Sequence, residues 1–175
     1  EREIFRRYDR FWSYLRRLKH LNLSNENSFL WLILKEINRS PRFLASLETL
    51  KLTLDFSHNQ TSITYPRNQL YEISRNEQFL KHLTHLNCKN FKGFQYYDGL
   101  MGSILAQCSK LISFIFPIGR EAYYFNSTDE IYKEYEGGTE VFSRLENLKN
   151  LQSLQVDVAG WESFLRHFSP PSSLQ

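Results

Sequence analysis

The stretch LASLETLKL (residues 44–52) has a leucine spacing that returns in LKHLTHLNC (residues 80–88). Both follow the phrase Leu-x-x-Leu-x-x-Leu-x-Leu, with Cys88 in place of the last leucine of the second copy. Further copies are LRRLKHLNL (15–23), the degraded LAQCSKLIS (105–113) and LENLKNLQSLQV (145–156). Self-similarity at intervals of some tens of residues is typical of a repeat protein in which each copy supplies one structural unit.

The spacing inside the phrase predicts the end of a helix followed by a strand. The last two leucines are two residues apart, so they point to one face of a strand. The earlier leucines recur every three residues, as they do on the core side of a helix. One unit cannot bury this apolar face alone, so neighbouring units must stack into a solenoid.

The phrase resembles the leucine-rich repeat, over about residues 11–175. The resemblance implies an α/β solenoid of horseshoe shape, with a parallel sheet on the concave side and helices on the convex side. The equivalent leucines are taken as Leu21, Leu50, Leu86, Leu111 and Leu154, which are 29, 36, 25 and 43 residues apart. Typical repeats run to about 20–29 residues. Two of the intervals therefore imply insertions, and the repeats resemble the irregular, helix-containing type.

One feature of the family departs from its usual place in this chain. The asparagine that the family carries three residues beyond the last strand leucine is replaced by Glu26, Asp55 and Phe91, while Asn25 and Asn90 stand one residue earlier. We therefore do not expect the regular ladder of asparagine side chains that ties adjacent repeats together in the family.

The sequence predicts two regions, a capping helix over residues 1–20 and about five repeats over 21–175, which continue past 175. Strands are expected at 21–23, 49–55, 85–88, 111–115 and 152–158, and helices at 28–38, 69–83, 100–108, 129–135, 140–150 and 161–168. Pro117 is expected to end the fourth strand. The segment around Leu174 matches the start of a sixth repeat.

The N-terminal helix carries most of the basic character of the chain. It has seven basic and three acidic residues, whereas the whole chain has a net charge of only +3. Its apolar face would cover the end of the first repeat, as terminal caps do in solenoids. A membrane-surface or calmodulin-target helix, or a docking face for an acidic protein or nucleic acid, are the alternatives.

Composition favours a cytoplasmic location. The sequence has no run of 18 apolar residues and no secretory signal at the start of the chain. Only two cysteines occur, and both take leucine positions of the phrase. The disulfide-rich caps usual in extracellular members of the family are therefore absent, which favours a reducing compartment. Four Asn-x-Ser/Thr sequons, at Asn22, Asn38, Asn59 and Asn126, point weakly the other way.

The sequence contains no catalytic motif, so we expect neither an enzyme nor a cofactor. Gly-rich phosphate loops, GxSxG and HExxH are all missing from the chain. The series His82-x-x-His85-x-x-Cys88 has a spacing that can bind zinc. Because His85 and Cys88 should point to opposite faces of a strand, exposed histidines and a buried cysteine are the expected arrangement, with no metal.

The residues that flank the strand leucines are the candidate partner-binding site, because they would point to the concave face. They are His20, Asn22, Ser24, Thr49, Lys51, Thr53, His85, Asn87, Lys89, Lys110, Ile112, Phe114, Ser153, Gln155 and Asp157. Tyrosines in the two long insertions, Tyr96, Tyr97, Tyr123 and Tyr124, either pack these insertions onto the solenoid or anchor a partner.

A polar and weakly basic concave face suits a protein or peptide ligand rather than a small-molecule substrate. We therefore expect a non-catalytic scaffold or adaptor, a subunit of a larger intracellular assembly. The alternatives are a substrate-recognition subunit of a ubiquitin ligase, and a protein that contacts RNA or a membrane through the basic N-terminal helix.

Overall fold

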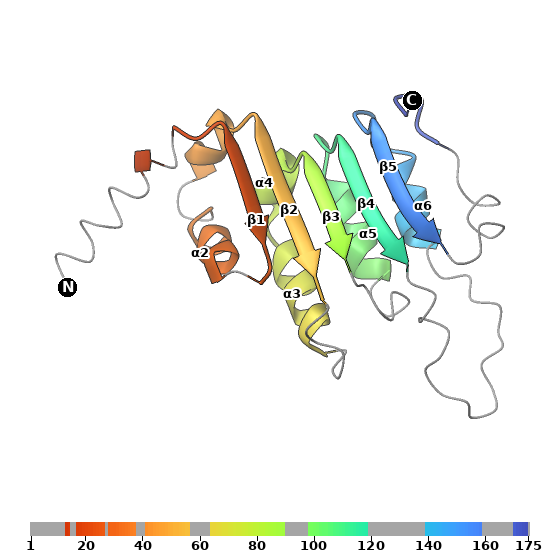
Figure 1. The fold of residues 1–175 in the computed structure, drawn as a ribbon, viewed down its shortest axis with the longest axis horizontal. Coiled ribbons are helices and arrows are strands. Elements are labelled where there is room, and N and C mark those ends of the chain that lie inside the picture. Colours follow the sequence, from red (N-terminus) through yellow and green to blue (C-terminus); the bar gives the residue numbers. More distant parts are fainter. Residues whose placement is uncertain are drawn as a thin grey trace.

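Five parallel strands form one sheet whose order, β1-β2-β3-β4-β5, is also their order in the chain (Figure 1). The strands are β1 (His20–Ser24), β2 (Thr49–Asp55), β3 (His85–Lys89), β4 (Ser113–Ile118) and β5 (Ser153–Val158). This computed structural model describes residues 13–14, 17–26, 28–37, 41–56, 64–89, 98–118, 139–158 and 170–174. The predicted α/β class with a parallel sheet is confirmed.

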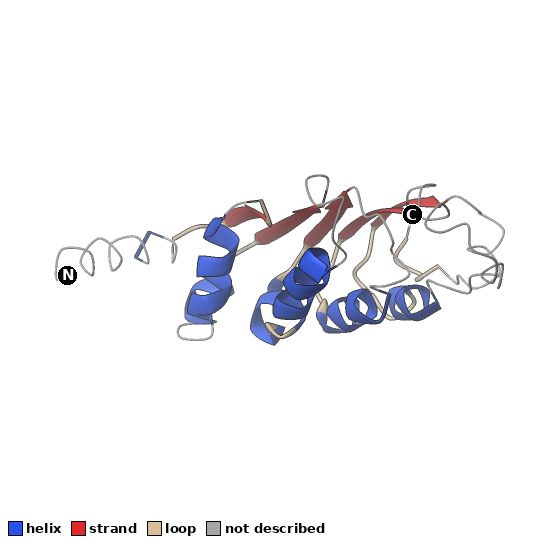
Figure 2. Ribbon diagram, turned by 90° about the horizontal axis from the view of Figure 1, so that it is seen from below, coloured by secondary structure: helices blue, strands red, loops and turns tan. Residues whose placement is uncertain are grey.

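All the described helices lie on one face of the sheet (Figure 2). They are α2 (Ser28–Ile37), the 3-10 helix η1 (Pro41–Ser46), α3 (Thr64–Ser74), α4 (Glu77–His82), α5 (Asp98–Gln107) and α6 (Thr139–Leu145). Each connection between successive strands carries at least one of them. The other face of the sheet is not covered by any helix within these described ranges, and we call it the open face.

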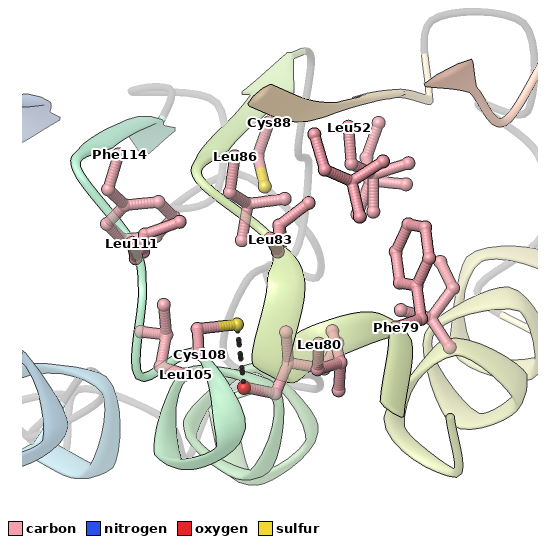
Figure 3. Packing of buried hydrophobic residues seen from close by; sticks show 14 of the residues in the cluster. Leu52, Phe79, Leu80, Leu83, Leu86, Cys88, Leu105, Cys108, Leu111 and Phe114 are labelled. Carbon is pink, nitrogen blue, oxygen red and sulfur yellow. Dashed lines mark hydrogen bonds between the residues drawn. The ribbon is translucent and has the colours of Figure 1, made fainter. Parts of the chain in front are cut away.

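The alternation of leucines with polar residues decides which side of each strand is buried. In β2, Leu50, Leu52 and Leu54 are at most 1% exposed, whereas Lys51 between them is exposed. The buried side chains of the strands meet those of the helices in one continuous core. Figure 3 shows Leu52 and Leu86 from the sheet packing toward Phe79, Leu80 and Leu83.

A tight turn, repeated along the chain, joins each helical segment to the next strand. In this turn the backbone N–H of one residue donates to the carbonyl three residues earlier. The pairs are Leu47 to Leu44, Leu83 to Leu80, Leu111 to Cys108, Leu151 to Leu148 and Leu174 to Pro171, at 3.0 to 3.1 Å. In the first four, the strand starts two residues after the donor leucine. The Leu-x-x-Leu part of the phrase is therefore the residue pattern of a defined turn.

The structure places the fourth strand two residues later than predicted. The degraded phrase aligns Leu111 with the turn leucine Leu83, so the inward residues of β4 are Phe114 and Phe116, both 0% exposed. Their rings stack with centroids 5.4 Å apart. The predicted strand at 111–115 was wrong because phenylalanines take the leucine positions of this repeat.

Pro117 does not end β4, contrary to prediction. It lies within the strand and pairs in register with Asp157 of β5, whereas the pairing of β4 with β3 reaches only to Ile115. A proline has no N–H to donate to a sheet. In the described part of the sheet the β3–β4 ladder ends at Ile115, so it does not need this donor.

The single helix predicted over 69–83 is two helices, α3 and α4, separated at Arg75 and Asn76. The Asn76 backbone N–H donates to the Ile73 carbonyl at 3.0 Å, and its side-chain Nδ2 donates to the Glu72 carbonyl at 2.8 Å. These bonds terminate α3, and the Asn76 carbonyl then accepts the Leu80 N–H of α4. α3 also begins earlier than predicted, at Thr64, with Pro66 in its first turn, where a proline is tolerated.

Several predicted features lie outside the described residues, namely most of the capping helix over 1–20 and the helices at 129–135 and 161–168. The segment 170–174 begins like a sixth repeat. Pro171 is buried, Leu174 packs against the core, and the Ser173 hydroxyl donates to the Leu151 carbonyl at 2.7 Å. None of the helices in the described part of the chain is long and apolar enough to span a lipid bilayer.

Candidate functional site

The open face is built from the residues that alternate with the buried leucines. Two rows cross all five strands in register. The first row is Asn22, Lys51, His85, Ser113 and Ser153, and the second is Ser24, Thr53, Asn87, Ile115 and Gln155. His20 and Thr49 form a further pair at one end of the face. With about 4.8 Å between neighbouring strands, each row spans roughly 19 Å.

The side chains of these rows are mostly small, polar and accessible. Asn22, Lys51, Ser153 and Gln155 are exposed, and the remaining members are partly exposed. Ile115 is the one apolar member of the two rows. Such a surface offers many hydrogen-bond donors and acceptors but little apolar area, which suits a polar ligand that lies flat across the strands.

A stagger between β2 and β3 sets which side chains are neighbours. Counted from the repeated turn, Thr49 and His85 occupy equivalent positions, yet Lys51 is the residue that pairs with His85. β3 is therefore shifted by two residues relative to β2. An even shift keeps every side chain on its face, because successive residues of a strand alternate.

At this shifted junction, the side chain of Thr84, just before β3, hydrogen-bonds to the backbone of β2. Its hydroxyl accepts from the Leu50 N–H at 3.0 Å and donates to the Leu50 carbonyl at 2.9 Å. The Thr84 backbone N–H donates to the same carbonyl at 2.9 Å. At the other junctions two successive backbone N–H groups reach the preceding repeat instead, as Ile112 and Ser113 do to the Thr84 carbonyl. The threonine side chain thus supplies the bonds that the shift removes.

The same hydroxyl fixes the imidazole of His85. His85 Nδ1 lies 2.9 Å from Thr84 Oγ1. Because the single hydroxyl hydrogen of Thr84 goes to Leu50, Nδ1 of the neutral ring must carry the hydrogen of this bond. Nε2 is then left as an acceptor. Partial burial, followed by the charge of Lys51, holds the pKa of His85 below its ordinary value.

Lys51 is the charged member of the two rows, which contain no aspartate or glutamate. On the same face of β2, Asp55 is partly exposed four residues further along the strand. Glu48, just before β2, is already paired with Lys19 at 3.0 Å. The hydrogen bond to Lys19 and the charge of that lysine lower the pKa of Glu48, so this carboxylate is ionised and paired with Lys19.

The amide oxygen of Asn87 is an unsatisfied acceptor in the second row. It is shielded from solvent and has no hydrogen-bond partner among the described residues. It stands between Thr53 and Ile115 in the register of the sheet. Leaving a buried acceptor unpaired costs about 1–3 kcal/mol. The Asn87 amide oxygen is therefore a polar atom that the described part of the fold leaves unpaired.

Most of the predicted site residues lie on the strands of the open face. His20, Asn22, Ser24, Thr49, Lys51, Thr53, His85, Asn87, Ser153 and Gln155 are placed there by register and exposure. Lys89 ends β3 and Asp157 is the next-to-last residue of β5, but their side chains lie outside the described ones. Tyr96, Tyr97, Tyr123 and Tyr124 also fall outside the described residues.

Three of the predicted site residues are not on this face. Phe114 is in the core, and its assignment to a binding face was wrong, because Leu111 is the turn leucine and the first inward residue of β4 is Phe114, three residues later. Lys110 is an exposed turn residue before β4, and Ile112 also precedes that strand. Ser113 and Ile115 are the residues of β4 on the open face. The sequence feature that could have revealed this register is the three-residue step from Leu111 to Phe114, which matches the step from Leu83 to Leu86.

The possible zinc ligands do not converge. His85 is on the open face, Cys88 is in the core, and His82 Nδ1 lies 2.9 Å from the Gln78 carbonyl on α4. Within the described residues no three groups of the metal-binding types come together. Cys88 and Cys108 are both buried, and burial raises the pKa of each thiol far above its ordinary value. Neither is a nucleophile in the folded state.

The chain was compared with models of known protein families, with curated proteins and with solved structures, and none of them matches it.

Proposed function

We propose that this chain is a non-catalytic interaction module of the leucine-rich repeat type, which binds a protein partner through its open face as part of a larger assembly. The observation that carries the proposal is the pair of polar rows that cross five parallel strands in register on the face without helices. These rows present side chains from every repeat to one ligand.

The solenoid part of the proposal is supported by the repetition of one structural unit. Successive strands are neighbours in the sheet, the same turn precedes four of them, and the described helices lie on one face. In a solenoid each repeat contacts its neighbours, and the strands together make an extended binding surface. Because the sheet is already formed, a ligand would bind it with little loss of conformational entropy.

The chemistry of the open face supports binding rather than catalysis. General acid–base catalysis needs a group whose pKa is near the working pH and which lies within reach of a second catalytic group. His85 is the titratable imidazole at the centre of the rows, and its neighbours are Lys51 and the Thr84 hydroxyl, which is already bonded to Leu50. Thiol nucleophiles are buried and protonated, as described above.

Quantitative affinity purification from the native source tests the proposal. The double variant Lys51→Glu/Gln155→Arg changes exposed positions of the open face on β2 and on β5, so it should fold normally while its partners are lost. The control is Lys149→Glu, an exposed charge reversal in the turn before β5. If the double variant keeps the same partners in the same amounts as the wild type, the open face is not the binding surface.

A further inference from the structure

We infer that the open face over β1, β2 and β3 binds an acidic, extended peptide segment of a protein partner, with a carboxylate of the peptide against Lys51. This inference rests on the proposed function and specifies the partner chemistry. It starts from the charge of Lys51, which has no carboxylate partner among the described residues.

The described lysines differ in their ion pairs and in their place in the fold. The ammonium group of Lys19 pairs with Glu48 at 3.0 Å, and that of Lys81 pairs with Glu77. Lys51 has no carboxylate partner among the described residues, although it is exposed in the middle of the face. Lys35, Lys110 and Lys149 are also exposed and have no carboxylate partner among the described residues, so what distinguishes Lys51 is its place on the open face. Its row neighbours are Asn22 and His85, which are a neutral amide and an imidazole whose pKa is lowered. A carboxylate is the group that complements this site.

The neighbouring polar groups fit the backbone of an extended peptide. Asn22 and Thr53 offer both donors and acceptors beside Lys51. An extended chain presents N–H and C=O groups that such side chains can bind. A strand rises about 3.3 Å per residue, so about six residues would cross the full 19 Å width of the sheet.

The same face is poorly suited to a nucleic acid. Sequence-independent nucleic acid binding depends on several lysine or arginine contacts to phosphates, and single strands also stack on aromatic side chains. The two rows contain one lysine, no arginine, and no phenylalanine, tyrosine or tryptophan. One charge surrounded by hydrogen-bonding groups favours a peptide with one or two carboxylates.

Binding of the full chain to synthetic twelve-residue peptide libraries tests this inference. Three libraries are randomised at all positions except two, which are fixed as glutamate, lysine or glutamine. The glutamate library should be retained best, and Lys51→Glu should reduce its retention at least about fivefold. Lys81→Glu, on the helical side of the molecule, is the matched control and should retain it like the wild type. Equal retention of the three libraries, no retention of any, or unchanged retention by Lys51→Glu would each overturn the inference.

A further variant separates this inference from the proposed function. Ser153→Arg places a large side chain on the open face at β5, away from Lys51. If peptides bind without an acidic preference but are lost in Ser153→Arg, the open face is a binding surface and the acidic chemistry is wrong. If neither Ser153→Arg nor Lys51→Glu changes peptide binding, both the inference and the proposed function fail.

Discussion

The side-chain amide of Asn25 binds both backbone polar groups of Asp55. Its Nδ2 donates to the Asp55 carbonyl at 2.9 Å, and its Oδ1 accepts from the Asp55 N–H at 2.8 Å. Nδ2 also donates to Gln69 Oε1 at 2.9 Å. Asn25 follows β1, Asp55 ends β2 and Gln69 lies on α3, so one side chain joins two repeats and a helix.

We expect Asn25→Ala to lower the free energy of unfolding by about 2–3 kcal/mol. The substitution removes three hydrogen bonds, each of which contributes about 0.5–1.5 kcal/mol net, and leaves the Gln69 oxygen without its donor. Urea denaturation followed by far-UV circular dichroism measures the change. Asn147→Ala is the control, because Asn147 is exposed and its Nδ2 makes one bond, to the Ser143 carbonyl. A loss as small as that of the control would show that water replaces Asn25.

Asn25 also shows where the resemblance to a family misled the sequence reading. Its position is one residue earlier than the family's asparagine, so no tie between repeats was expected there. The structure shows that Asn25 nevertheless reaches the next repeat. Its amide needs only a buried place beside the end of β2, and Asn25 is 5% exposed. Whether an asparagine connects two repeats therefore depends on its burial beside backbone groups that need a partner. It does not depend on its position relative to a consensus.

The register of β4 gives a prediction that separates two neighbouring residues. Phe114→Ala should cost about 3–5 kcal/mol, because it removes a fully buried ring and leaves a cavity between β3 and β5. Ile115→Ala should cost under about 1 kcal/mol, because that side chain is on the open face and partly exposed. Thermal or urea unfolding of the two variants checks the order. The reverse order would mean that the earlier register, with the strand at 111–115, is correct.

The sequence predicts the positions of most strands, but it does not predict which side chains are neighbours in the candidate site. The leucine alternation was enough for β1, β2, β3 and β5, because burying every second residue allows only one face to be apolar. It was not enough for β4, where Phe114 and Phe116 replace leucines. Nor could the sequence reveal that Lys51 lies beside His85 instead of Asn87. A shift of two residues leaves the alternation unchanged and depends on the Thr84 side chain bonding Leu50.

The pairing of Lys51 with His85 should be visible in the titration of the imidazole. We expect Lys51→Met to raise the pKa of His85, because it removes the second of the two causes that lower it. The value should stay below the ordinary 6.5, because partial burial is the larger cause and remains. Two-dimensional NMR of the imidazole signals against pH measures both values. An unchanged pKa would mean that the lysine points away from the ring.

The same lowered pKa predicts how stability changes with pH. A histidine whose pKa is lower in the folded state binds fewer protons there than in the unfolded chain, so the free energy of unfolding rises with pH. The contribution of His85 is present above pH 6.5 and is lost as the pH falls through the lowered folded-state pKa. Unfolding of His85→Gln and of wild type, compared at several pH values between 5 and 7.5, should show a smaller loss on acidification for the variant. Equal slopes would contradict the shift.

The two thiols test how cooperatively the stacked repeats open. Cys88 lies in β3 and Cys108 follows α5, where its Sγ donates to the Ile104 carbonyl at 3.1 Å (Figure 3). Both are 0% exposed, so Ellman's reagent at pH 8 should label neither in the folded protein. We expect labelling of the single variants Cys88→Ala and Cys108→Ala to follow the opening of the remaining site.

An exposed thiol gives the reference rate for this labelling experiment. Ser109→Cys, in a background without the two native cysteines, places a thiol in the exposed turn next to Cys108 and should react at the rate of a free thiol. Because Phe114 packs in the same core cluster as Cys88 and Cys108, Phe114→Ala should speed the labelling of both native thiols together if the repeats open as one unit. Acceleration of one thiol alone would mean that adjacent repeats open separately, and rapid labelling of either in the wild type would contradict its burial.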